Sequence, residues 1–287
     1  MSETVGSGHL VSWESGFLMI GRSDAIIPMH AHYAIQIAFG AQPGIRFRLS
    51  DGEPWTAYDG VVIASRQPHS MDATQVTPMI VLFVEPETRE GRMLAQRCGE
   101  SGIAALSEQE IAGVAAPLFK AWRDERSLAG VTAAAEAVIR ALTAGVEPPV
   151  VSDERLLRAT AYIRSHLDRP LTLEEVAEVA CLSPSRFRHL FVEETGMALR
   201  PYILWRRFLR VWELMTARES LSAAAHAAGF ADAAHLTRTC RRMFGFPPSA
   251  LQLAAPLRTE SGDGGVPRAR EASYPNPSAR PRPTIAP

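Results

Sequence analysis

The segment LTLEEVAEVACLSPSRFRHLF (residues 171–191) predicts two short amphipathic helices joined by a tight turn. Thr172 is a good N-cap for the first helix. Ser183 is an equally good cap for the second, and Pro184 suits its first helical position because the fixed φ of proline is already helical. The second helix gathers its bulky apolar side chains on one stripe: Phe187, Leu190 and Phe191. Two such helices form a helix-turn-helix, whose second helix typically enters the major groove of DNA.

The same pattern repeats further along the chain. Residues 221–245, LSAAAHAAGFADAAHLTRTCRRMFG, match residues 173–196, with Asp232 in the capping position and one extra residue in the turn. Between the two copies, RPYILWRRFLRVWELM (200–215) predicts a long amphipathic helix. Two helix-turn-helix units on one connecting helix predict an all-α DNA-binding domain over residues 153–255.

These residues resemble the AraC/XylS family of bacterial transcription regulators. The chain departs from the family pattern at Cys240, where an aromatic residue is usual, and at Ala250-Leu251, where the family has an aromatic–arginine pair. The resemblance implies two recognition helices that read successive major grooves. Arg186 lies off the exposed face of its helix and is more suited to phosphate. Because Ala233 and Ala234 can offer at most apolar contacts, we expect the second unit to read fewer bases. The side chains that we expect at the DNA are Ser185, Arg186, Arg188 and His189 in the first unit, and Ala233, Ala234, His235, Thr237 and Arg238 in the second.

The length of the chain and the distribution of its charge are consistent with a second domain on the N-terminal side of the DNA-binding domain. A chain of 287 residues suggests about two domains. Acidic side chains are in excess over residues 1–152 and basic ones over residues 153–255, so the positive charge lies where phosphate contacts are expected. The three cysteines form no CxxC pair, and no signal peptide or membrane-length apolar run is visible. We therefore expect a cytoplasmic location.

The first part of the chain predicts an all-β domain. Residues 1–86 alternate short apolar runs with turn residues, as barrels and sandwiches do. The stretches HAHYAIQ (30–36) and YDGVVIASRQPH (58–69) resemble the small β-barrel called a cupin, the usual sensor of AraC-like regulators. His30 and His32 are two residues apart and would face the same side of a strand. We expect an effector pocket lined by His30, His32, Gln36, His69, Tyr33 and Trp55.

The histidines also raise the question of a metal. In metal-binding cupins three histidines and a glutamate hold a divalent ion, but here Gln36, an uncharged and poor ligand, takes the place of the acid. The sequence therefore favours pocket-lining or packed side chains over metal ligands at His30, His32 and His69, and it predicts no cofactor. The same substitution argues against the alternative of a metal-dependent cupin enzyme fused to a DNA-binding domain.

The segment between the two domains is alanine-rich, and residues 87–145 predict helices. By the resemblance, we expect these helices to pair two subunits. A two-heptad seam runs along them at Val131, Ala135, Val138 and Leu142. Residues 146–152 contain a Pro-Pro pair and predict a stiff linker. Residues 256–287 are rich in Gly, Pro and Ser and predict a disordered tail.

Taken together, the sequence predicts a multidomain, non-enzymatic transcription regulator, active as a homodimer. Its expected partners are a double-stranded DNA operator, a small-molecule effector and RNA polymerase. Activation and repression are both compatible with this interpretation. The remaining alternative is a ligand-independent architectural protein whose barrel serves only to dimerise.

Overall fold

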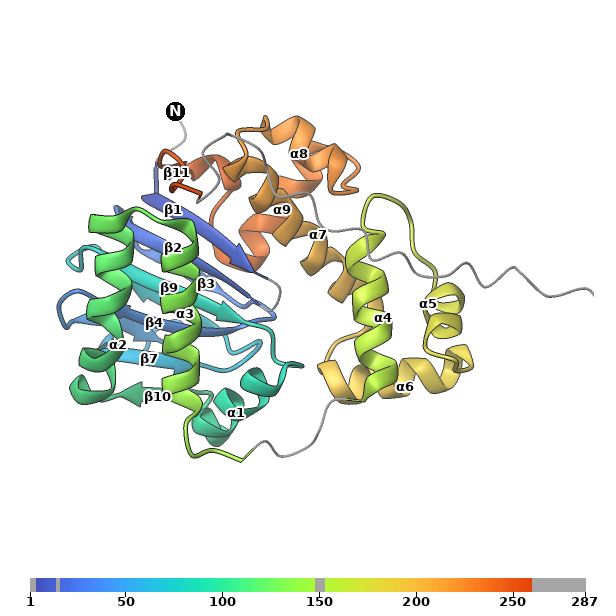
Figure 1. Ribbon diagram of the computed structural model, residues 1–287, viewed down its shortest axis with the longest axis horizontal. Coiled ribbons are helices and arrows are strands. Elements are labelled where there is room, and N and C mark those ends of the chain that lie inside the picture. The colour runs from blue at the N-terminus through green and yellow to red at the C-terminus, as the bar shows by residue number, and fades with distance from the viewer. Residues whose placement is uncertain (1–3, 14–15, 148–152, 260–287) are drawn as a thin grey trace, which may run out of the picture.

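The computed structural model describes residues 4–13, 16–147 and 153–259, and it shows a β-rich N-terminal domain followed by a helical C-terminal domain (Figure 1). This is the predicted fold class: an all-β barrel-like domain with helices, then an all-α double helix-turn-helix domain. Most of the expected linker, residues 148–152, lies outside the described residues. So does the expected tail beyond residue 259.

Two sheets form the N-terminal domain. The larger has the strand order β10-β7-β4-β9-β2-β1-β11, and the smaller has the order β3-β8-β5-β6. The strands are β1 Gly6–Trp13, β2 Gly16–Ser23, β3 Ile27–His30, β4 Ile35–Gly40, β5 Ile45–Arg48, β6 Thr56–Tyr58, β7 Gly60–Ile63, β8 His69–Asp72, β9 Met79–Val84, β10 Ile103–Leu106 and β11 Leu251–Leu253. Successive side chains on a strand face opposite sides, and both faces of the larger sheet are covered, which explains why its central strands β4 and β9 are buried almost throughout and apolar apart from Gln36.

Helices cover one face of the larger sheet. They are α1 Arg89–Cys98, α2 Glu108–Lys120 and α3 Leu128–Thr143, and Figure 1 shows α2 and α3 lying across the strands. The apolar side of α3 packs into the same buried cluster as Leu18 and Ile37 of the sheet. The seam expected to join two subunits, Val131, Ala135, Val138 and Leu142, is part of this cluster. It therefore packs within the chain and is not available to a partner.

Residues 87–145, where helices were expected, also contain a strand. Residues 103–106 form β10, which pairs antiparallel with β7 at the edge of the larger sheet, Ile103 opposite Ile63. The sequence did not indicate this strand, because a run of four residues carries little periodicity and its pairing partner lies far away along the chain.

The C-terminal domain has the predicted pair of helix-turn-helix units. Its helices are α4 Glu154–Ser165, α5 Leu173–Val179, α6 Pro184–Thr195, α7 Leu199–Thr216, α8 Leu221–Ala227 and α9 Ala233–Phe244. The predicted caps are in place, because the side chains of Thr172, Ser183 and Asp232 each accept a hydrogen bond from a backbone N–H in the first turn. The long helix α7 connects the two units.

The two domains are tied together by the end of the chain. Strand β11 follows α9 and pairs parallel with β1, Gly6 opposite Leu251. Leu257 is buried, and the Arg258 N–H donates to the carbonyl of Arg126 (2.7 Å). The expected tail from residue 256 is therefore wrong for its first residues, since an apolar side chain anchors them to the N-terminal domain. We call residues 251–258 the C-terminal strap.

No helix within the described residues combines the length and the apolar character needed to cross a bilayer.

Candidate functional site

The first recognition helix, α6, presents its N-terminal half to solvent. The side chains of Ser185, Arg186, Arg188 and His189 are all exposed, as predicted from the helix faces, while Phe187 between them is fully buried. Within the described ranges no ion pair engages Arg186 or Arg188. Both guanidinium groups are thus available to a ligand outside the chain.

The turns ahead of the two recognition helices have the same geometry. Cys181 and Gly229 both adopt a left-handed backbone, with φ of 56° and 77°. At Gly229 a Cβ would lie 2.6 Å from the Leu167 carbonyl oxygen, so only glycine fits there. In each turn the next N–H bonds back to the preceding helix at 2.9 Å, from Leu182 to Ala177 and from Phe230 to Ala225. The sequence repeat is therefore a structural repeat.

The second recognition helix, α9, offers fewer free polar groups. Ala234 and Arg238 are exposed, whereas Ala233, His235 and Thr237 are half-buried. The Thr237 hydroxyl donates to the Ala233 carbonyl (2.8 Å), and the His235 ring packs edge-on against Phe230. Of the five side chains expected at DNA in this unit, Arg238 keeps the most freedom to reach a base.

The predicted barrel histidines come together where the two sheets meet. His30 ends β3 and pairs across the smaller sheet with His69 of β8, and His32 lies in the loop just beyond β3. One ring nitrogen from each lies within 4.8 Å of the other two, and all three side chains are buried. The sequence predicted His30 and His32 on one strand, but His32 reaches the others from a loop. We call these three residues the histidine cluster.

The rings of the histidine cluster are neutral at pH 7. Burial lowers the pKa of His30 to about 3, helped by the neighbouring His32. Burial likewise lowers the pKa of His32, and it holds the pKa of His69 well below its usual range. A neutral imidazole keeps one nitrogen as a lone-pair acceptor, so each ring of the cluster retains one acceptor nitrogen.

A pocket opens beside this cluster at the junction of the domains. It is a partly open hollow of about 480 Å³ when the adjoining solvent space is included, and its walls come from the barrel strands and from the end of the second helix-turn-helix unit. The lining includes His30, Gln36, Met71, Met79, Phe83, Phe244, Phe246 and Leu251. Two of the predicted effector residues therefore reach the pocket, and its remaining walls are mostly apolar.

Tyr33 and Trp55 lie elsewhere. The Tyr33 hydroxyl donates to Glu87 (2.9 Å), and the Trp55 ring lies under the Arg48 guanidinium, 5.0 Å from the ring centroid. Neither side chain lines this pocket. Tyr33 is instead part of the contact between the domains.

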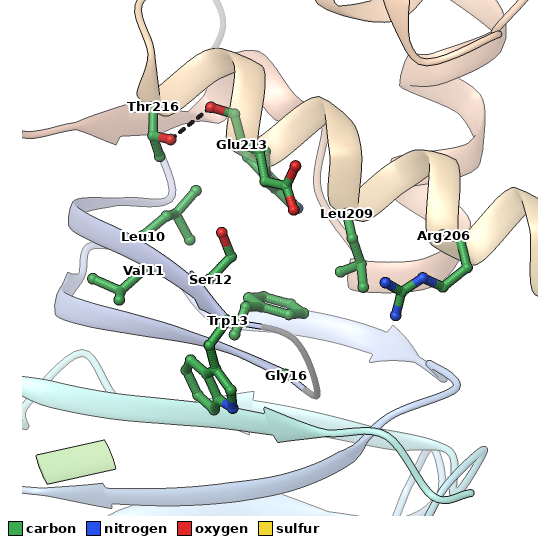
Figure 2. A pocket seen from close by; sticks show the side chains of 11 residues that line it. Leu10, Val11, Ser12, Trp13, Gly16, Arg206, Leu209, Glu213 and Thr216 are labelled. Carbon is green, nitrogen blue, oxygen red and sulfur yellow. Dashed lines mark hydrogen bonds between the residues drawn. The ribbon is translucent and has the colours of Figure 1, made fainter. Parts of the chain in front are cut away.

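A second pocket also lies between the domains (Figure 2). Figure 2 shows Leu10 and Ser12 of β1 facing Arg206, Leu209 and Glu213 of α7 across it, while the Trp13 ring points away from α7. Both pockets thus have one wall in each domain.

Buried polar contacts cross the same junction, and no local sequence pattern marks them. The hydroxyls of Tyr33 and Tyr202 both donate to the Glu87 carboxyl group (2.9 Å each), whose pKa burial raises. Two ion pairs also cross it, Arg206 with Glu85 and Arg92 with Glu194. Glu194 lies in the last turn of α6, so the first recognition helix is directly attached to the sensor domain.

The C-terminal domain is similar in sequence to known proteins. A family model described as a helix-turn-helix domain matches residues 176–254. The multiple antibiotic resistance protein MarA of Salmonella typhimurium is 33% identical over 93 residues, which are 32% of this chain and 73% of MarA. The arabinose operon regulatory protein of Escherichia coli is 31% identical over 119 residues, and the match spans 40% of this chain and 39% of that regulator.

A solved structure extends the likeness to both domains. A single-substitution variant of apo ToxT from Vibrio cholerae aligns with a TM-score of 0.55 over 83% of this chain and 97% of ToxT, at 8% sequence identity. At this identity the likeness is one of fold, and it covers the barrel as well as the helix-turn-helix units.

Proposed function

Since the chain belongs to the AraC/XylS family of transcriptional regulators, we propose that it binds a specific DNA operator through α6 and α9 and that a small molecule at the domain junction controls this binding. The observation that carries the proposal is the pair of exposed, unpaired arginines on α6, in a unit repeated at α9. The matched arabinose operon protein is named as a regulatory protein, which supports a regulatory rather than an enzymatic role.

The exposed face of α6 supports base reading. Arg188 is one turn into the helix, where a recognition helix lies deepest in the groove, and a guanidinium can donate two hydrogen bonds to a guanine edge. Arg186 lies off this face and is suited to a phosphate. Arg238 gives α9 one comparable donor, beside the apolar methyl of Ala234. The first unit is therefore the principal reader.

The pocket beside the histidine cluster supports effector control. Because its walls include Phe83 of β9 and Phe244 of α9, a ligand that fits only the docked arrangement of the domains stabilises that arrangement. A ligand that separates Phe244 from the barrel has the opposite effect. Either way, the orientation of α9 relative to α6 depends on the occupant, which couples the effector to DNA affinity.

A homodimer on two operator half-sites and a contact with RNA polymerase complete the proposed function. Because the apolar side of α3 is used within the chain, the dimer would use another surface of the N-terminal domain. Sedimentation of the full chain at increasing concentration measures the dimer directly. A monomer at all concentrations, with and without operator, would remove this part of the proposal.

Selection from random DNA tests the main proposal. The full chain should enrich one motif, and Arg188→Ala should lose about 1–3 kcal/mol of discrimination at one base pair of it. Arg186→Ala is the matched control: it should weaken all sequences alike and reduce the slope of log K against log salt by about one. Enrichment of no motif by the folded full chain would refute the proposal.

A further inference from the structure

We propose that Arg207 sets the separation of the two recognition helices, and with it the spacing between the two DNA elements that the chain recognises. Arg207 lies at the middle of α7, and its side chain contacts both helix-turn-helix units. The inference rests on the proposed function for its consequence at the operator, whereas its structural part can be measured without DNA. We call the Arg207 guanidinium, the Leu167 and Arg169 carbonyls and Gly229 the inter-unit clasp.

The clasp engages the first unit at the loop between α4 and α5. Arg207 Nε donates to the Leu167 carbonyl oxygen (3.1 Å), and Arg207 Nη2 donates to the Arg169 carbonyl oxygen (2.9 Å). Both carbonyls come just after α4 ends at Ser165, where no further helical turn supplies donors. The planar fork of a guanidinium can reach two such acceptors at fixed angles, which an ammonium group cannot do.

The loop that accepts these bonds is itself braced by Arg169. The Arg169 guanidinium donates to the Tyr162 hydroxyl of α4 (2.9 Å) and to the Glu175 carboxylate of α5 (3.1 Å). The Tyr162 hydroxyl also donates to Glu175 (2.6 Å), and Leu167 is buried. A shift of the loop therefore moves α4 and α5 with it. The hold of Arg207 on the loop is for this reason a hold on the whole first unit.

The second unit meets the same groups at the turn ahead of α9. A Cβ at Gly229 would lie 2.6 Å from the Leu167 carbonyl oxygen and 2.8 Å from Arg207 Nε, so the Gly229 backbone packs directly against the clasp. Cys181 occupies the equivalent turn of the first unit with the same left-handed backbone, yet it carries an exposed side chain. The two turns thus differ because only the second faces the other unit.

The clasp consequently holds the start of α9 at one distance from the first unit. Burial lowers the pKa of Arg207, since its guanidinium has lost water where it meets the loop, and the nearby Asp168 raises it. Each base pair of B-DNA adds about 3.4 Å of rise and about 35° of rotation. Recognition of elements one base pair further apart would require α9 to move by both amounts relative to α6. The clasp opposes this movement.

Spin labels in the two turns measure the separation directly in the full chain. Cys181 is exposed and so is Ala231 of the second turn, which makes Cys181 and Ala231→Cys a pair of accessible label sites. The other two cysteines, Cys98 and Cys240, are buried and will not be labelled, because burial raises the pKa of both thiols, that of Cys98 to about 11. Electron spin resonance then gives the distribution of distances between the labels.

We expect a single narrow distribution in the otherwise unchanged chain. Arg207→Ala should broaden it by roughly twofold or more, and Arg207→Lys, which keeps the charge but loses the fork, should give an intermediate width. Arg210→Ala is the matched control, because Arg210 is an exposed arginine of α7 that pairs with Glu213 of the same helix. It should leave the width unchanged.

Operator spacing is the second measurement. Once selection from random DNA has given a two-part motif, one base pair is inserted or deleted between the parts. Binding of the wild-type chain should weaken by more than roughly tenfold, because one recognition helix loses its bases. Arg207→Ala should bind the original spacing less tightly and lose less than roughly threefold on the changed spacings. Arg210→Ala should behave as the wild-type chain.

A purely structural role for Arg207 is separated by a variant that is destabilised elsewhere. Ile163→Val removes a methyl group from the fully buried core of the first unit and lowers stability without touching the clasp. It should change neither the label distances nor the spacing preference. Broadening in Ile163→Val equal to that in Arg207→Ala would overturn the proposal, because Arg207 would then act through stability alone.

Two other outcomes would also overturn it: a distribution as narrow in Arg207→Ala as in the wild-type chain, or an unchanged loss of affinity on the altered spacings. If Arg207→Ala does not fold, the same comparisons with Arg207→Lys decide the matter. Failure of the full chain to enrich any motif would refute the proposed function, and the label distances, measured without DNA, would still decide the role of Arg207.

Discussion

Replacing Arg92 with alanine should release the first recognition helix from the sensor domain. The Arg92 guanidinium of α1 donates to the Glu194 carboxylate near the end of α6, and this ion pair joins the two domains. Without Arg92, the Glu194 carboxylate is left partly desolvated and without this partner whenever the domains are docked. The loss therefore falls on the docked arrangement and not on the fold of either domain.

The burial of the pair sets the magnitude. The Arg92 and Glu194 side chains are only 15% and 12% exposed. Breaking a fully buried pair costs about 3–5 kcal/mol, and exposed pairs contribute about 0–1 kcal/mol, so a value of about 2–3 kcal/mol is expected here. At 1.4 kcal/mol per factor of ten, the docking equilibrium should shift by roughly 30- to 150-fold.

Hydrogen exchange followed by mass spectrometry measures this shift. The amides of α6 should exchange faster in Arg92→Ala, and a cycle with Glu194→Ala should show that the two losses are not additive. Arg155→Ala is the control, because Arg155 pairs with Asp153 inside the C-terminal domain and is half-exposed. Additivity within about 0.5 kcal/mol, or unchanged exchange in α6, would refute the idea that this pair fastens the helix.

Three further predictions follow from other contacts. Arg238→Ala should lose less base discrimination than Arg188→Ala on an operator with point-changed base pairs; the reverse ranking would make α9 the principal reader. Val138→Asp should lower the free energy of unfolding of the N-terminal domain, measured in urea, by at least roughly 3 kcal/mol, because it buries a charge in an apolar core. A variant that stays folded but becomes monomeric would instead restore α3 as a dimer surface. His9 donates to the Ala255 carbonyl and accepts from Trp122, and burial lowers its pKa. Its stabilisation of the C-terminal strap is therefore complete above pH 6.5 and falls by up to about 1.4 kcal/mol per pH unit below it. Hydrogen exchange of the strap amides that slows on acidification, after correction for the intrinsic rate, would contradict this.

The DNA-binding domain was predictable because its determinants are local. Caps such as Ser183 and stripes such as Phe187 and Phe191 specify a helix from within a dozen residues, and the repeat gives a second reading of the same signal. The left-handed turn at Gly229 follows the same logic, since only glycine fits there. Exposure of Arg188 then follows from the helix geometry alone.

The sensor domain was predictable only in part, because its contacts are distant in sequence. The alternating strands and the His30-x-His32 spacing located the barrel and most of the histidine cluster. The spacing of Val131 and Val138 correctly indicated a buried helix face, but periodicity does not say whether the covering surface belongs to the same chain. Nothing near Glu87 or Leu257 in the sequence indicates what either side chain contacts.

Because β11 pairs with β1, one edge of the first strand stays without its partner strand until the last part of the chain has been synthesised. His9 and its partner Ala255 are 246 residues apart. At synthesis rates of about 5–20 residues per second, the edge of β1 remains unpaired for roughly 10–50 s on the ribosome. An open strand edge is a template for any other strand, including β11 of a neighbouring nascent chain. The protein must therefore protect β1 during its own synthesis, and slow translation or truncation before residue 251 should favour strand-exchanged or aggregated products over the monomer.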